Sequence, residues 1–192
     1  MDNANIITNL QNCFLVATPQ LDGSAFEKSI IYICNHNDDG AMGLMVNSPI
    51  DEISFSDIVN SMGIIKPLDS IADPIIYSGG PVDSNRGFVI HSHEYFHEST
   101  IQVSSDIFLS ASAEIVSAIA RDEGPKDVNF CLGYAGWSPG QLENEIATNG
   151  WLVVPADADI LFNTPAEERF EACMSKMGFA HAMHWAENAG LA

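Results

Sequence analysis

The sequence predicts a single α+β domain, in which a mixed β-sheet that could curl toward a barrel is flanked by short helices. Its 192 residues and hydrophobic fraction of 46% suit one well-covered core. Short apolar runs outnumber helical patterns, and the two do not alternate regularly as they would in a doubly wound fold. No repeat or low-complexity linker divides residues 1–192, although the tail after about residue 178 is poorly specified.

The expected strands are short runs rich in β-branched and aromatic residues, bounded by turn residues. They cover residues 13–17, 29–34, 41–46, 75–77, 87–91, 128–132 and 151–154. Asp38, Asp39 and Gly40 separate the second and third runs. Because an Asx-Gly turn between two strands is typical of a hairpin, these two strands are expected to pair.

The expected helices begin at capping residues and end at glycine or proline. A capping box at residues 54–57 opens a short helix that Gly63 ends. Ser104 or Ser105 could cap a second helix that runs to Arg121. The last two are predicted over about residues 139–148, where proline occupies the first position, and 164–177.

The charge of the chain disfavours direct nucleic-acid binding. It has 26 acidic residues against 7 Lys and Arg, for a formal net charge of -19. The seven cations form no basic stripe and are Lys28, Lys66, Arg86, Arg121, Lys126, Arg169 and Lys176. Phosphate backbones are held mainly by Lys and Arg, so direct DNA binding is not expected and would need a basic partner or subunit. The simplest interpretation of the acidity is a solvated surface.

Several patterns indicate a reduced, cytoplasmic protein. No apolar stretch approaches the roughly 18 residues of a membrane helix, and the N-terminus lacks the pattern of a signal peptide. Cys13, Cys34, Cys131 and Cys173 are far apart, so neither a disulfide nor a zinc motif is expected. Neither phosphate-loop nor dinucleotide-binding spacing is present, and no cofactor is predicted.

The strand-to-helix corner at residues 132–146 is the most informative part of the chain. It places Tyr134 and Trp137 beside glycines, which let a ligand or another segment approach the backbone. Trp137 could stack on a ligand or fill the core, whereas Tyr134 favours the core because it directly follows a strand. Gln141 is expected to cap the helix, and Glu143 to lie at the edge of its buried face as a candidate ligand-binding group.

Further candidate binding residues come from three other segments. Gly79, Gly80 and Pro81 form a loop open to unusual backbone conformations. Arg86 follows that loop and could clamp a carboxylate or phosphate, or simply form an ion pair. Asn47 follows the third predicted strand.

Histidines supply two weaker candidates. His36 precedes the hairpin turn and is either a polar member of a site or a hydrogen-bonded structural residue. His91, His93 and His97 are weak candidates for metal ligands, because residues 91 and 93 would share one face of a continuing strand. Surface histidines without a metal are the preferred interpretation, and no metal is predicted.

Together these segments resemble a known family. The similar stretches are residues 14–19, 36–49, 79–82, 86–89 and 132–143, in that order. The chain resembles the AlgH (YqgE-like) family from about residue 12 to about residue 178. The resemblance implies a bacterial cytosolic α+β protein without an established biochemical activity, in a family sometimes described as transcriptional regulators of alginate expression. Ser48 stands where the family usually has Arg, which removes an expected cation.

Two functional hypotheses follow. The first is a non-catalytic regulatory or adaptor protein whose candidate residues converge on one surface that binds a small anionic ligand or a partner segment. The second is an uncharacterised enzyme, hydrolase-like and possibly metal-dependent, with His36 and Glu143 as acid and base. Known catalytic motifs are missing from the sequence, which favours the first hypothesis.

Overall fold

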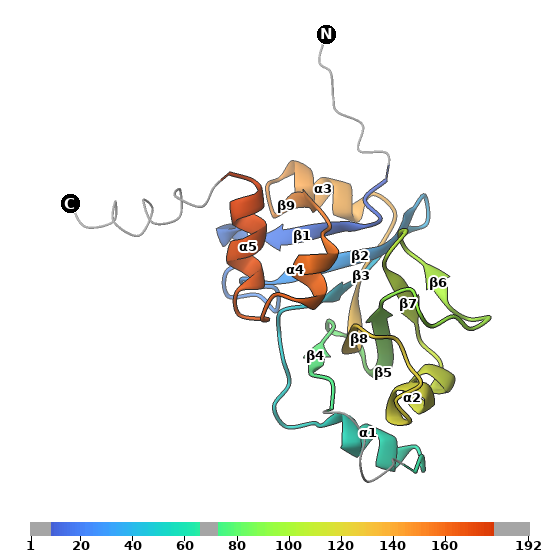
Figure 1. Ribbon diagram of the computed structural model, residues 1–192. Helices are drawn as coiled ribbons and strands as arrows, with labels where there is room; N and C mark the ends of the chain where they lie inside the picture. Colours follow the sequence, from blue (N-terminus) through green and yellow to red (C-terminus); the bar gives the residue numbers. More distant parts are fainter. Residues whose placement is uncertain (1–8, 66–72, 179–192) are drawn as a thin grey trace.

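Most of the strands belong to one curled sheet around the long strand β8 (Figure 1). The structure is a computed structural model that describes residues 9–65 and 73–178. In these residues the strands are β1 (Cys13–Ala17), β2 (Ile30–Asn37), β3 (Gly40–Met45), β4 (Ile76–Ser78), β5 (Val82–His91), β6 (Ile101–Gln102), β7 (Phe108–Ser110), β8 (Val128–Trp137) and β9 (Trp151–Pro155). The helices are η1 (Pro19–Leu21), α1 (Phe55–Ser61), α2 (Ala113–Ala120), α3 (Gln141–Ala147), α4 (Ala158–Phe162) and α5 (Arg169–Lys176).

The sheet is mixed, as the sequence predicts. Its order is β6-β7-β5-β8-β3-β2-β1-β9, with every neighbouring pair antiparallel. β4 pairs with β8 in parallel and lies off this path. β8 pairs with β4 and β5 through its first part and with β3 through residues 135–137, so it joins the two halves of the sheet. The predicted single α+β domain is confirmed.

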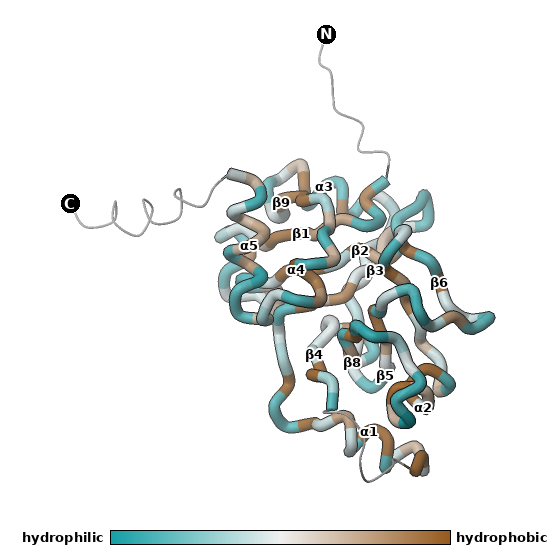
Figure 2. The backbone as a smooth tube through the Cα atoms, viewed as in Figure 1, coloured by the Kyte–Doolittle hydropathy of each residue, from teal (hydrophilic) through white to brown (hydrophobic). Residues whose placement is uncertain are grey.

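Both faces of the sheet are buried, which explains why several strands read as continuous apolar runs. In β1, Phe14 and Val16 join a core beneath α4 and α5, while Leu15 joins a second core beneath α3. A third core lies where α1 and α2 pack on β5 and β8. Figure 2 shows the matching hydrophobic colouring along β1 and α4.

The helix expected from Ser104 or Ser105 to Arg121 is wrong in its first half. β7 occupies residues 108–110, and α2 begins only at Ala113. Ser104 Oγ does accept a hydrogen bond from the amide of Ile107, 3.1 Å away, but this closes a turn and not a helix. Pairing of β7 with β5 and β6 outweighs the local helical pattern. α4 was not expected, and α5 starts later than the predicted helix.

The described helices are all short, and none is long and apolar enough to cross a membrane. The four cysteines are free, three of them buried and Cys13 half-buried.

Candidate functional site

The strand-to-helix corner is built as a tight turn between β8 and α3. The strand continues to Trp137, and Gly140, with φ 75°, caps the helix. The helix begins at Gln141 and not at about residue 139 as predicted. The side-chain oxygen of Gln141 accepts a hydrogen bond from the amide of Ser138 at 3.1 Å, which closes the turn before the helix.

Trp137 is a core residue whose polar atom is fully used. Only 6% of it is exposed, and its indole N–H donates to Glu145 Oε2 at 2.9 Å. Trp151 donates to the same oxygen at 2.8 Å, and Gln141 donates to the other carboxylate oxygen at 2.9 Å. The Glu145 carboxylate thus ties α3 to β8 and β9. The presence of Trp137 at this corner is explained by its packing and its hydrogen bond, without a stacked ligand.

His36 and Glu143 lie side by side, with His36 buried and Glu143 exposed. The amide of Leu10 donates to His36 Nδ1 at 2.9 Å, so Nδ1 must be unprotonated. His36 Nε2 therefore carries the proton and donates to Glu143 Oε1 at 2.8 Å. Hydrogen bonds from its own backbone amide and from His36 lower the pKa of Glu143. This pair anchors α3, and neither ring nitrogen of His36 is free to act on a substrate.

The loop containing Gly79 and Gly80 packs directly against β8. The amide of Gly79 donates to the carbonyl of Leu132 at 2.8 Å, and its carbonyl accepts from Met45 at 2.8 Å. A Cβ on Gly80 would lie 2.2 Å from the carbonyl carbon of Tyr134. Both glycines are buried, which leaves Pro81 as the exposed residue of the loop.

Arg86 and Tyr134 are brought together by Phe88. The exposed Arg86 guanidinium lies 5.1 Å from the centre of the Phe88 ring, and the Tyr134 ring packs edge-on against Phe88 at 5.7 Å. In residues 9–65 and 73–178 no carboxylate forms an ion pair with Arg86. Asn47 lies elsewhere, where its side chain links the amide of Ile30 at 2.8 Å to the carbonyl of Lys28 at 2.9 Å.

The candidate side chains on β2, β5, β8 and α3 therefore form two groups and not one surface. Successive residues of a strand point to opposite faces. Tyr134 packs with Phe88 beneath α4 and α5, whereas Ala135 and Trp137 belong to the core beneath α3. Arg86 lies with the first group, and His36 and Glu143 lie with the second.

His91 is hydrogen-bonded at both ring nitrogens, to a backbone carbonyl and to a pair of linked hydroxyl groups. It is fully buried, and its Nδ1 contacts the carbonyl of Ser92 at 2.8 Å, which requires a proton on Nδ1. Nε2 consequently accepts from Ser110 Oγ at 3.0 Å, and Ser110 Oγ lies 2.8 Å from Thr100 Oγ1. Both ring nitrogens are thus occupied by the protein.

His93 and His97 do not complete a metal site with His91. His93 is exposed, and His97 Nδ1 lies 3.1 Å from Ser99 Oγ. Across the described part of the chain, no three His, Cys, Asp or Glu side chains are grouped to hold a metal ion.

The burial of His91 predicts that this residue lowers the stability of the folded protein at acidic pH. Burial lowers the pKa of His91 below its ordinary value of 6.5. The unfolded chain therefore binds a proton at this histidine more readily than the folded chain does. As a result, the contribution of neutral His91 to the free energy of unfolding is present above about pH 6.5 and is lost as the pH falls below that value. His91→Gln should reduce the loss of unfolding free energy between pH 7.5 and 5.5, by at most about 1.4 kcal/mol per pH unit.

Urea unfolding at both pH values measures this difference. His93→Gln, which removes an exposed histidine two residues after the end of β5, is the matched control and should behave like the parent. An unchanged pH dependence in His91→Gln would refute the assignment.

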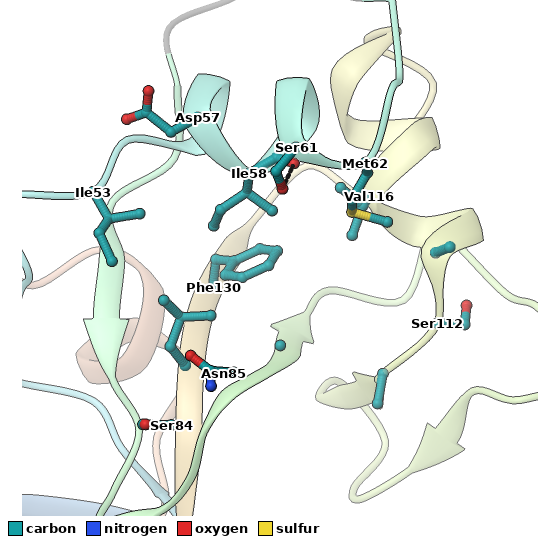
Figure 3. A pocket seen from close by; sticks show the side chains of 14 residues that line it. Ile53, Asp57, Ile58, Ser61, Met62, Ser84, Asn85, Ser112, Val116 and Phe130 are labelled. Carbon is teal, nitrogen blue, oxygen red and sulfur yellow. Dashed lines mark hydrogen bonds between the residues drawn. The ribbon is translucent and has the colours of Figure 1, made fainter.

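A groove in the protein surface lies beside the third core (Figure 3). Its volume is about 410 Å³, and its walls come from α1 and the segment before it, β5, β8 and the start of α2. Ile58, Met62, Val116 and Phe130 are among its apolar side chains. Met62 is 42% exposed and Ile53, at another edge, is 37% exposed. The groove is thus an apolar surface open to solvent.

The comparisons with known proteins identify the family. The family model described as AlgH-like matches residues 14–182. The chain belongs to the AlgH-like family. It is 47% identical over 171 residues to a UPF0301 protein of Agrobacterium fabrum, a match that covers 86% of this chain and 85% of the relative. A UPF0301 protein of Dechloromonas aromatica is 42% identical over 180 residues, with 94% of both chains covered.

Solved structures agree with this assignment. The solution structure of the AlgH protein from Pseudomonas aeruginosa matches with a TM-score of 0.77 and 36% identity, covering 93% of each chain. A protein from Corynebacterium diphtheriae, 20% identical, matches with a TM-score of 0.67 over 87% of this chain and 86% of that one, and shows the fold alone. The resemblance predicted from the glycine-rich segments is confirmed.

The groove of this AlgH-like chain was not predicted from the sequence. The predicted helix after Ser54 carries Phe55 and Val59, which are buried, and also Ile58 and Met62, which line the groove. These four positions have the ordinary i, i+3, i+4, i+7 spacing of a single apolar face. The spacing alone therefore does not distinguish the two residues that line the groove from the two that are buried.

Proposed function

We propose that this protein is a non-catalytic adaptor that binds a segment of a partner protein in the groove between α1, β5, β8 and α2. The supporting observation is the apolar lining, with Ile53 and Met62 partly exposed at its edges (Figure 3). Apolar surface that stays open to water is typical of interaction sites. A cytoplasmic location, expected from the sequence, is part of the proposal.

Charge favours a partner segment over a small anion at this place. Among the residues lining the groove, the charged one is Asp57. Its carboxylate accepts hydrogen bonds from the amide and hydroxyl of Ser54, which lower the pKa of Asp57 and keep it negative. The formal net charge of -19 further opposes anions and nucleic acid. Arg86 does not supply a positive charge to the groove lining, because its guanidinium lies over Phe88, which belongs to a different core from the groove residue Phe130.

The chemistry of the groove also supports a non-catalytic role. Its lining contains neither histidine nor cysteine, and Asp57 is already engaged in a helix cap. General acid or base catalysis needs a group positioned to exchange a proton with a substrate. The His36 and Glu143 pair of the enzyme hypothesis is likewise engaged, with both ring nitrogens hydrogen-bonded.

Met62→Glu should weaken partner binding at least tenfold. A glutamate there would place a charge where an apolar side chain of the partner packs, and burying such a side chain contributes about 1.5–3 kcal/mol. Twelve-residue peptides selected from a random displayed library against the parent protein serve as the probe. Their affinities for parent and variant are then measured by fluorescence polarisation.

Ile101→Glu is the matched control, since Ile101 is 56% exposed on the edge strand β6 and outside the groove. It should keep the parent affinity within about twofold, as expected of a residue outside the interface. Peptides that bind Met62→Glu as tightly as the parent, or a library that yields no binder, would overturn the proposal.

A further inference from the structure

Acidic residues lie close in sequence to the groove-lining residues, and this excess of negative charge limits which partner segments the groove can bind. Within two positions of the groove-lining residues, the chain carries five carboxylates against one cation, Arg86. The five are Asp51, Glu52, Asp57, Asp83 and Glu114. Two residues span less than the Debye length of about 8 Å at physiological ionic strength, so these charges act on anything bound in the groove.

Few cations lie near these carboxylates. Asp51, Glu52, Asp83 and Glu114 are all exposed, and the ion pairs in the described residues involve none of them. Glu114 does line a second surface hollow together with Arg121. Hydrogen bonding with Ser112 lowers the pKa of Glu114. Arg86, the one cation within two positions of the groove-lining residues, lies over the ring of Phe88, which belongs to a different core from the groove residue Phe130. The segments that form the apolar groove therefore carry an excess of negative charge, and these carboxylates are called the acidic rim.

A second copy of this chain is a poor occupant. The most exposed aromatic side chain of the described residues is Phe96, at 72%, and it could in principle enter the groove of a neighbour. However, Glu94 and Glu98 lie two positions to either side of it. Docking would bring these carboxylates against the acidic rim, and each chain carries a formal net charge of -19. Like charges placed together oppose such association.

We infer that the groove binds an apolar segment of a partner protein that is flanked by Lys or Arg. This inference rests on the proposed adaptor function and specifies its partner class. The apolar side chains of the segment would pack against Ile58, Met62 and Phe130, and its flanking cations would face the acidic rim. Apolar burial would supply most of the affinity, while the charges would raise the association rate and exclude acidic segments.

Two displayed libraries of 14-residue peptides test this inference. Both carry the same randomised six-residue centre, with four fixed lysines on each side in one library and four fixed glutamates in the other. The lysine library should yield binders at 50 mM NaCl, and their affinity should fall at least tenfold at 300 mM NaCl because salt screens the charges. Met62→Glu should abolish their binding.

Two charge-neutralised variants separate the rim from the overall charge. The rim variant is Glu52→Gln, Asp83→Asn, Glu114→Gln, and the remote variant is Asp38→Asn, Asp39→Asn, Glu171→Gln. Both remove three charges, but the remote positions lie in the β2–β3 turn and on α5, away from α1 and α2 (Figure 1). The rim variant should lose at least fivefold in affinity for the lysine peptides, and the remote variant less than twofold.

Failure of the basic-partner inference and failure of the adaptor proposal give different results. If the glutamate library yields as many binders as the lysine library, and these binders are sensitive to Met62→Glu, the inference of a basic partner segment is overturned. The proposed adaptor function would still stand. Equal losses in the rim and remote variants would show that overall charge, not the rim, attracts the lysines, and would overturn the inference as well. No binder from either library would overturn both proposals.

Discussion

Replacing Gly80 with alanine should lower the free energy of unfolding by about 3 kcal/mol or more. Gly80 has φ +149°, a conformation that residues with a side chain rarely adopt. Its Cβ would lie 2.2 Å from the carbonyl carbon of Tyr134 and 2.5 Å from the amide nitrogen of Ala135. Both contacts are with the backbone of β8, so relief requires that a central strand moves.

Gly23→Ala is the matched control for this substitution. Gly23 also has a positive φ, +76°, but a Cβ there would meet no atom within 4 Å. It should cost only the backbone penalty of about 1–2 kcal/mol. Urea unfolding of both variants measures the difference, and equal losses would refute the role of close packing at Gly80.

Much of the sheet was predictable because its strands are locally distinct. β1 and β9 carry unbroken apolar runs bounded by turn residues, and the structure places them next to each other in the sheet. The hairpin of β2 and β3 follows from the Asx-Gly turn before Gly40. These features depend on near neighbours in the chain, which a sequence displays directly.

Elements that depend on distant partners were not predictable. Residues 108–110 form a strand only because β5 and β6 lie on either side of it. β8 likewise extends beyond residue 132 because β3, about ninety residues earlier, pairs with residues 135–137. The amino-acid pattern around these residues does not indicate which distant strands they pair with.

The sequence predicted that some candidate residues lie close together, but it did not indicate the hydrogen bonds and packing that hold them. His36 and Glu143 do meet, yet the backbone amide of Leu10 fixes the tautomer of His36 and makes the pair structural. Tyr134 and Trp137 are three residues apart but face different cores, because strand geometry alternates. The groove combines four distant segments, so spacing along the chain could not reveal it.

Arg169→Met should cost about 3–5 kcal/mol of unfolding free energy, because three acceptors would lose a charged donor. Arg169 is only 3% exposed. Its guanidinium donates to the carbonyls of Val46 and, at 2.9 Å, Thr164, and to the side-chain oxygen of Asn129 at 3.4 Å. Tyr77 lies beneath it, with its ring centre 5.2 Å away. Burial lowers the pKa of Arg169, with Tyr77 acting in the opposite direction.

The prediction differs from that for a buried ion pair, which apolar residues can often replace without loss. In the described residues no carboxylate pairs with Arg169, and its partners are two backbone carbonyls and an amide that remain after substitution. Arg169→Lys should recover less than half of the loss, because an ammonium lacks the planar fork that reaches three separate acceptors. Arg121→Met, at an exposed position, should change stability by less than about 0.5 kcal/mol. If urea unfolding finds Arg169→Met as stable as the parent, the guanidinium does not hold α5 to the sheet, and packing of its apolar neighbours must do so.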